Sequence, residues 1–203
     1  MAETGAATRS AALALADERA LMREGHRFLD EKRMLLAGEL LRQLREHEAL
    51  EARLVDATAA AREALRRALQ RHGLEGLQAY PGGTLDAAGL QVAGSTFLGV
   101  ALQRLDAGAP VATRPAPAID ASPEAHACAA AFAALVEPLA RLAVVRASLE
   151  RLAAEYRRTE RRARALENVL LPEVERALAT IGERLDAADQ EEAVRIRLAG
   201  RRP

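Results

Sequence analysis

An apolar or small residue recurs in alternating steps of three and four through the second half of the chain, and this repeat constrains the fold more than any other feature. It runs without a break from Leu142 to Leu170, over four heptads. Its members are Leu142, Val145, Leu149, Leu152, Tyr156, Thr159, Ala163, Leu166 and Leu170, with Leu135 before them. This spacing places all of them on one helix face and is typical of paired helices. The stripe continues, with a shifted phase, through Val174, Leu178, Ile181 and Leu185.

A second helix of comparable length is predicted at the amino-terminal end. From Arg9 to His72 the chain contains no proline, and residues that favour helix fill the segment. A stripe with the same spacing is made of Leu36, Leu40, Gln43, His47, Leu50, Leu54, Ala57 and Ala61. Gln43 and His47 form a polar gap in this stripe, and His47 is best interpreted as a tolerated polar layer that sets the register of the pair. Gly73 is expected to end the helix as a C-cap glycine.

The middle of the chain has a different character, because Gly and Pro gather between Gly73 and Pro123. Within it, residues 90–102 carry β-branched and apolar residues on both sides of Gly94-Ser95. This pattern predicts a short β-hairpin that turns there, bent by Gly99. A two-stranded ribbon alone is marginal in water, so we expect it to pack on the helices or on a partner.

Helix is predicted to resume at Ser122. The order Ser122-Pro123-Glu124 supplies an N-cap, a proline in the first turn and an early acid. Pro138 and Pro172 lie farther along the same helical segment and are expected to bend it.

Together these patterns predict a mainly all-α protein. Its N- and C-terminal helices should form a long antiparallel two-helix coiled coil, and a small central insert should carry the hairpin. The predicted divisions are 9–72 for the first helix, 73–122 for the insert and 123–198 for the second helix. We expect a rod with a knob at one end and both termini at the other.

Composition narrows the class of function. Lys+Arg 29 against Asp+Glu 29 gives a net charge of +0, which argues against a general binder of nucleic acid or anionic membranes. The single cysteine, Cys128, excludes an internal disulfide and a thiolate zinc cluster. No uninterrupted apolar run of roughly 18 residues is present, so no membrane insertion is expected. The first residues lack the features of a signal peptide, and a soluble, intracellular protein is expected.

The sequence contains no recognised catalytic motif. The run from Gly94 to Gly99 has Val100 where a P-loop requires lysine. The histidines His26, His47, His72 and His126 are each more than 20 residues apart, so no two of them form a metal pair on one helix turn. His126 and Cys128 point to different sides of a helix, and no G-x-S-x-G elbow is present. We therefore expect no cofactor, no metal and no active site.

Five arginines fall within eight residues, and they are the candidate interaction site. The arginine cluster consists of Arg157, Arg158, Arg161, Arg162 and Arg164, interspersed with Glu155, Glu160 and Glu167. One interpretation is a solvated face with ion pairs one turn apart. The other is a cationic surface that meets an acidic partner. Nucleic acid is a weaker third choice, because no stacking aromatic residues accompany the arginines.

Two segments resemble a known family. Thr8-Arg9-Ser10, followed by Gly25 to Arg33 (GHRFLDEKR), resembles the amino-terminal signature of the D subunits of V-type and A-type ATPases. Residues 156–172 (YRRTERRARALENVLLP) are similar to that family's second signature, R-R-T-x-R-R-V-N-A-L-E-x-x-x-I-P. Residues 173–175, Ile181 and residues 191–197 resemble its closing helix. Ala163 and Arg164 depart from the family's Val-Asn.

The resemblance implies a rotor shaft without an active site of its own. In this family the coiled coil enters a hexamer of catalytic A and nucleotide-binding B subunits. The other end binds the small F subunit of the stalk and sits on the funnel-shaped subunit that leads to the membrane ring. Rotation couples proton or sodium transport to ATP synthesis or hydrolysis, on the cytoplasmic side of the membrane. The interface residues that the resemblance suggests are Thr8, Gly25, Arg157, Arg158, Arg161, Arg162, Arg164 and Glu167.

An alternative stays open at this point. A non-rotary helical hairpin that tethers two proteins, or acts as a scaffold, explains the two stripes and the neutral charge equally well. It does not explain the Thr8 segment and the 158–172 segment together. An enzyme is the third class, and no convergent set of titratable residues supports it.

Overall fold

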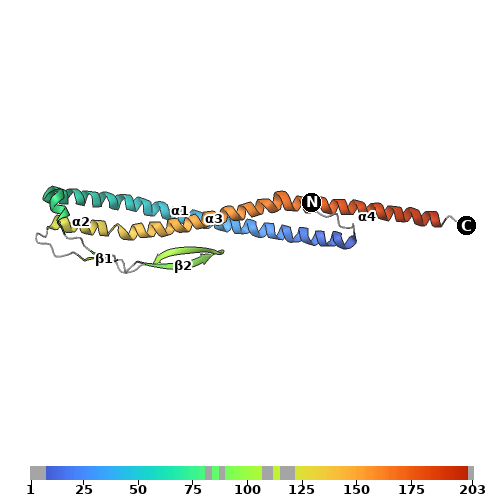
Figure 1. Ribbon diagram of the computed structural model, residues 1–203, viewed down its shortest axis with the longest axis horizontal. Coiled ribbons are helices and arrows are strands. Elements are labelled where there is room, and N and C mark those ends of the chain that lie inside the picture. Colours follow the sequence, from blue (N-terminus) through green and yellow to red (C-terminus); the bar gives the residue numbers. More distant parts are fainter. Residues whose placement is uncertain (1–7, 81–83, 87–89, 107–111, 115–121, 201–203) are drawn as a thin grey trace. The chain divides into compact units, whose positions relative to one another are not determined.

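The computed structural model describes residues 8–80, 84–86, 90–106, 112–114 and 122–200 (Figure 1). Long helices precede and follow short strands along the chain, as the sequence predicts. In chain order the elements are α1 (Arg9–Gln78), β1 (Thr84–Asp86), β2 (Gln91–Phe97), β3 (Val100–Asp106), β4 (Ala112–Arg114), α2 (Pro123–Ala133), α3 (Val136–Ala165), the π-helix η2 (Leu166–Leu170) and α4 (Leu171–Ala199). The predicted fold class is confirmed.

The chain divides into two compact units, and residues of both long helical segments contribute to each. The first unit combines 1–35 with 156–203, and the second is 36–155. These units are defined by contacts in space, whereas the divisions 9–72, 73–122 and 123–198 follow the order of elements along the chain. Those divisions stay a prediction.

In the first unit the start of α1 runs antiparallel to α4. Arg9 is ion-paired with Asp189 at 3.1 Å, and Arg23 is ion-paired with Glu175 at 2.7 Å. Partner numbers fall as α1 numbers rise, which defines the antiparallel direction. Both pairs are exposed, so they contribute little to stability. The stripe supplies the core: Thr159, Ala163 and Val174 are buried.

In the second unit the remainder of α1 packs on α2 and α3, again antiparallel. Ala64 and Ala68 form a cluster with Cys128 of α2. Farther along, Leu40 and Leu44 line one surface hollow together with Leu149 of α3. Small residues in the first of these contacts let the helix backbones approach closely.

The predicted stripes are the buried faces of the helices. Every member of the amino-terminal stripe from Leu36 to Ala61 is buried or half-buried, including Gln43 and His47. In the second stripe all members from Leu135 to Leu185 are buried or half-buried except Leu170, which is 39% exposed. The fully buried Leu36 and Leu152, each 0% exposed, both belong to the stripes.

Two helical stretches of α1 meet across a kink at Gly73. Its φ of 68° and ψ of 174° are non-helical, and the helix then continues to Gln78. A residue with a Cβ would be strained at that φ, so the backbone here explains the choice of glycine. The predicted end of the first helix at Gly73 is confirmed, and a second, short stretch of helix follows it to Gln78.

The predicted hairpin exists, but its turn lies elsewhere. β2 and β3 pair antiparallel from Gln91↔Asp106 to Phe97↔Val100, so the two loop residues are Leu98 and Gly99. Both have positive φ, 49° and 85°, as a type I′ turn requires. The prediction of a turn at Gly94-Ser95 is therefore wrong. Gly94 lies within β2 opposite Gln103, and a second short ribbon pairs β1 with β4.

The two helical prolines each lie in the first turn of a helix. α2 ends at Ala133 and α3 begins at Val136, so Pro138 lies in the first turn of α3, where its missing N–H has no intrahelical partner to lose. The helical segment is interrupted just before this proline, and the bend predicted at Pro138 stays a prediction. Pro172 lies in the first turn of α4, directly after the π-helix, and the N–H of Leu171 donates to the carbonyl of Leu166 there.

The helical stretch 123–199 contains a window with a mean hydropathy of 1.8, long and apolar enough to cross a membrane by length and composition. The expectation from the sequence considered only an uninterrupted apolar run, and this window does not contain one. Ala125, Cys128, Ala133 and Leu135 in this stretch are buried. Only 22% of that window is buried inside the structure.

Candidate partner-binding surface

The first turn of α1 is capped by Thr8, one of the residues singled out from the sequence. Thr8 is exposed, and its Oγ1 accepts a hydrogen bond from the N–H of Ala11 at 3.2 Å. The same oxygen lies 3.1 Å from Oγ of Ser10. This is the geometry of an N-cap, which satisfies a helix donor that has no intrahelical partner. The hydroxyl therefore has a structural role at this position.

Gly25 and Glu167, far apart in sequence, belong to one contact region. A Cβ added to Gly25 would lie 4.0 Å from Cδ1 of Leu166, which is ordinary van der Waals contact. The neighbouring His26 is half-buried, with Nε2 3.7 Å from Oε2 of Glu167 and Nδ1 3.4 Å from Oδ2 of Asp30. The structure thus brings together the two segments that carry the sequence resemblance.

The arginine cluster lies on the solvent face of α3. At about 100° per residue its five members fall within an arc of about 160°, opposite the buried Thr159 and Ala163. Arg164 is ion-paired with Glu160 at 2.6 Å. The other four side chains are exposed and form no ion pair or side-chain hydrogen bond with any residue that the structure describes; they are Arg157, Arg158, Arg161 and Arg162.

Both sequence interpretations of the cluster stay predictions. Arg164 has the internal ion pair that the solvated-face interpretation predicts. Four guanidinium groups within about two helix turns keep their donors for solvent or a partner, and their charges add to one local positive potential. Guanidinium forks match carboxylates in geometry, so an acidic protein surface is the chemistry that fits.

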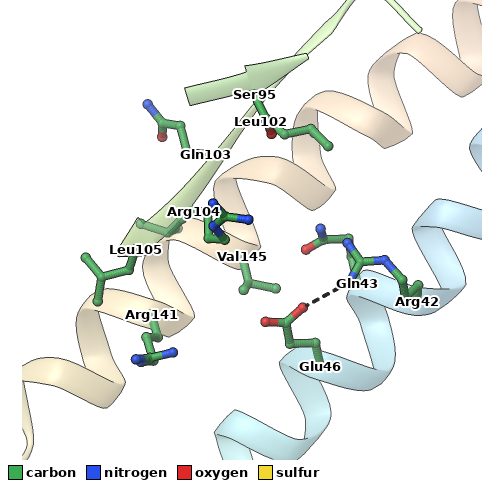
Figure 2. Close-up of a pocket in the computed structure, with 11 residues that line it drawn as sticks. Arg42, Gln43, Glu46, Ser95, Leu102, Gln103, Arg104, Leu105, Arg141 and Val145 are labelled. Atoms are coloured by element: carbon green, nitrogen blue, oxygen red, sulfur yellow. Dashed lines mark ion pairs between the residues drawn. The ribbon is translucent and has the colours of Figure 1, made fainter. Parts of the chain in front are cut away.

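A groove lies between α1, the β2–β3 hairpin and α3 (Figure 2). It has a volume of about 230 Å³ and receives three arginines, Arg42, Arg104 and Arg141. Each already has a carboxylate partner: Arg42 pairs with Glu39 at 2.6 Å and with Glu46 at 3.5 Å, Arg141 with Glu137 at 2.9 Å, and Arg104 with Asp106 at 3.6 Å.

One of these pairs shifts the pKa of a carboxyl beside the groove. The hydrogen bond from Arg42 holds the pKa of the Glu39 carboxyl below its ordinary value, against the opposing effect of burial. Gln43 adds a second hydrogen bond to Glu39 at 3.1 Å. With its positive charges already compensated, the groove does not have the character of an anion site.

A polar network joins the end of α1 to the start of α2. Nε2 of His72 lies 2.5 Å from Oγ of Ser122, and the N–H of Ser122 donates to the Tyr80 hydroxyl at 2.8 Å. Oγ of Ser122 also accepts from the N–H of Ala125 at 3.1 Å, which confirms the predicted N-cap. The rings of His72 and Tyr80 meet edge to face. Sequence spacing gave no signal for this network, because its members are up to 50 residues apart.

Among the residues that the structure describes, no three His, Cys, Asp or Glu side chains come together in a group that could hold a metal ion.

The family model for the ATP synthase D subunit matches residues 11–201. The D subunit of a V-type ATP synthase from Anaeromyxobacter dehalogenans is 34% identical over 204 residues, which covers 95% of this chain and 93% of that protein. The D subunit of the V-type ATP synthase of Thermotoga neapolitana is 25% identical over 192 residues, 95% of each chain. The D subunit of the A-type ATP synthase of Methanopyrus kandleri is 28% identical, over 94% of this chain and 83% of its own.

Proposed function

Because this chain belongs to the family of D subunits of V-type and A-type ATP synthases, we propose that it is the central-stalk subunit of such a complex and acts as its rotor shaft. It turns inside the hexamer of A and B subunits. Its rotation couples proton or sodium transport across the membrane to ATP synthesis or hydrolysis in that hexamer. The chain itself contributes no catalytic group.

The contact between the two signature segments carries this proposal. Gly25 and His26 meet Leu166 and Glu167 across the antiparallel pair, directly after the exposed arginines of α3. A shaft must hold its two helices in fixed register while its outer face passes successive stations. Buried Thr159 and Ala163 on one side, and exposed guanidinium groups on the other, meet both requirements.

Specific partners follow as part of the proposal. The arginine cluster faces the A and B subunits, and the second unit, with its hairpin, binds the small F subunit and the funnel-shaped subunit. The protein is then peripheral, on the cytoplasmic side of the membrane. The exposed charges and the sparse aromatic residues suit a surface that slides rather than locks.

Co-purification tests membership in the complex. A tagged full-length chain is isolated from native membranes in mild detergent, and its partners are identified by mass spectrometry. The A and B subunits are expected in the same particle. Their absence would overturn the proposal.

Cross-linking tests rotation and separates the shaft from a static scaffold. In the assembled complex, Arg158→Cys is joined to the surrounding hexamer through a cleavable linker, while the buried Cys128 stays unmodified. ATP hydrolysis should stop when the linker forms and return when it is cleaved. A complex that hydrolyses ATP at the same rate and pumps ions with the linker in place would show a static tether.

A further inference from the structure

One edge of the β2–β3 hairpin is covered by α3. The N–H of Gln103 donates to Oγ of Ser148 at 3.2 Å, and the Ser148 hydroxyl donates to the carbonyl of Gln103 at 3.3 Å. Arg151 donates to the carbonyl of Ala101 at 3.2 Å. The backbone groups of Gln103 and Ala101 therefore point away from β2, toward the helix beside which the hairpin lies (Figure 1).

The same geometry fixes the groups that β2 presents on its other edge. In an antiparallel ladder a residue whose backbone groups point outward faces a partner whose groups also point outward. Gln103 is paired with Gly94 and Ala101 with Thr96. Gly94 and Thr96, and Val92 two residues earlier, thus direct their N–H and C=O groups to the outer edge. None of the three is hydrogen-bonded to another described residue there.

This outer edge lacks the usual protection against pairing. Natural edge strands carry a charge, a proline or a bulge that blocks the addition of another strand. β2, with the sequence QVAGSTF, has no charge and no proline, and it pairs residue for residue with β3 without a bulge. Val92, Gly94 and Thr96 are all exposed, and a Cβ built on Gly94 meets nothing within 4 Å.

We propose that the outer edge of β2 is a strand-addition site for an extended, uncharged segment of another subunit of the same ATP synthase complex. Side chains satisfy such outward groups one at a time, as Ser148 and Arg151 do on β3, whereas another extended backbone complements every second residue of the edge. β2 offers no charge that could pair with a charged side chain, so an uncharged segment fits it, and the space over Gly94 accommodates a side chain at its centre. This inference rests on the proposed function, since family membership makes the chain one subunit among several.

Amide hydrogen exchange resolved to single residues tests the site. In the isolated full-length chain, the amides of Val92, Gly94 and Thr96 should exchange at the rates of amides that have no hydrogen-bond partner. Those of Ala93, Ser95 and Phe97 point into the ladder and act as the internal control. In the complex purified from native membranes, the three outward amides should slow at least tenfold, while the inward ones change little.

A matched pair of variants tests the hydrogen bonds themselves. Thr96→Pro removes one outward N–H, and proline is tolerated on an edge strand at such a position. Thr96→Val keeps the N–H and a similar shape. The proline variant should lose the subunit bound at this edge about fivefold more readily on dilution, and the valine variant should behave as the wild type. Protection of Ser95 and Phe97 in each isolated variant verifies that the hairpin remains folded.

The outcomes separate this inference from the proposed function. A chain that enters the complex with its three outward amides still open would overturn strand addition and leave the shaft intact. Absence of the chain from the complex would overturn both. Protection that appears in the isolated chain as its concentration rises would identify a second copy as the occupant, against the proposal.

Discussion

The hydroxyl of Ser148, fully buried on α3, occupies the place of a neighbouring strand for Gln103 of β3, because it both accepts from the N–H and donates to the carbonyl of that residue. Two backbone groups at the covered edge of the hairpin are satisfied by one side chain. Since a two-stranded ribbon is marginal alone, this bond is part of what holds the hairpin on the helices.

Ser148→Ala is predicted to destabilise the docked hairpin by about 1–3 kcal/mol, because it leaves the backbone groups of Gln103 without partners. The amide of Gln103 should then exchange faster in the isolated chain, while the amides of the helices far from the hairpin keep their rates. Ser95→Ala, an exposed serine of β2, is the control and should change little. Equal exchange at Gln103 in wild type and variant would contradict this role.

Substitution of two glycines tests where the hairpin turns. Gly99 has a φ of 85°, at which a Cβ costs about 1–2 kcal/mol. Gly99→Ala should therefore weaken the hairpin by about that amount. Gly94→Ala should be neutral or stabilising by about 0.5 kcal/mol, because the space around it is open and its φ is not positive. Exchange rates of the hairpin amides measure the effect of each substitution on the stability of the hairpin. If Gly94→Ala weakened the hairpin more than Gly99→Ala, the turn would lie at Gly94.

The hairpin also illustrates what sequence patterns decide and what they leave open. The stripes from Leu36 and from Leu142 follow from helix periodicity alone, and the structure buries them. Two glycine-containing sites, Gly94 and Gly99, were equally compatible with a turn by residue type. The choice depends on which register lets β3 bury Val100 and Leu102 while α3 covers its edge. That choice is tertiary, and Ser148 carries no local signal of it.

The arginine cluster, too, was predictable from the sequence only in part. The five arginines were visible as a run, and helix geometry placed them opposite the stripe. Spacing did not decide which of them pair internally, because Arg157 and Arg164 both lie about one turn from Glu160. The pair that forms is Glu160 with Arg164, in which the glutamate precedes the arginine by four residues, the more favourable order on a helix.

Leu152 should be the most sensitive position of the second stripe. It is 0% exposed, whereas its neighbour Leu149 is half-buried. Leu152→Ala should lower the free energy of unfolding by about 2–5 kcal/mol, and Leu152→Asp by more, because the carboxylate would be buried without a partner. Urea unfolding followed by circular dichroism measures the change. Leu139→Ala, at a residue 47% exposed, is the control and should have a much smaller effect.

Cys128 should react slowly in the folded chain. Burial raises the pKa of its thiol above the ordinary 9.0, so little thiolate forms near neutral pH. Reaction with an aromatic disulfide reagent at about pH 8 should be at least tenfold slower than in urea. Because the folded pKa is the raised one, stability is retained below the ordinary pKa of 9.0 and falls as the pH rises above that value. Equal rates in the folded and unfolded chain would show that the contact with Ala64 and Ala68 is open.

The arginine cluster gives the most direct test of the shaft. Arg157, Arg158, Arg161 and Arg162 are changed together to Gln, and ATP hydrolysis and ion pumping are measured in the reconstituted complex across a salt series. The matched control changes four exposed arginines of the second unit, Arg45, Arg53, Arg62 and Arg71, which likewise form no ion pair with any described residue. Both variants should unfold within about 1 kcal/mol of the wild type, since exposed charges contribute little to stability.

Coupling should suffer only in the first variant. A shaft must meet each station of the surrounding ring with similar, modest attraction, or it would remain in one orientation. Charge attraction varies smoothly with angle, whereas a fitted apolar contact does not. Salt should reduce the wild-type coupling, because the Debye length is about 8 Å at physiological ionic strength. In the variant without the four arginines, coupling should already be low, and salt should not reduce it further. If both variants pump and respond to salt as the wild type does, the arginines are a solvated face and the contact with the ring lies elsewhere on the helices.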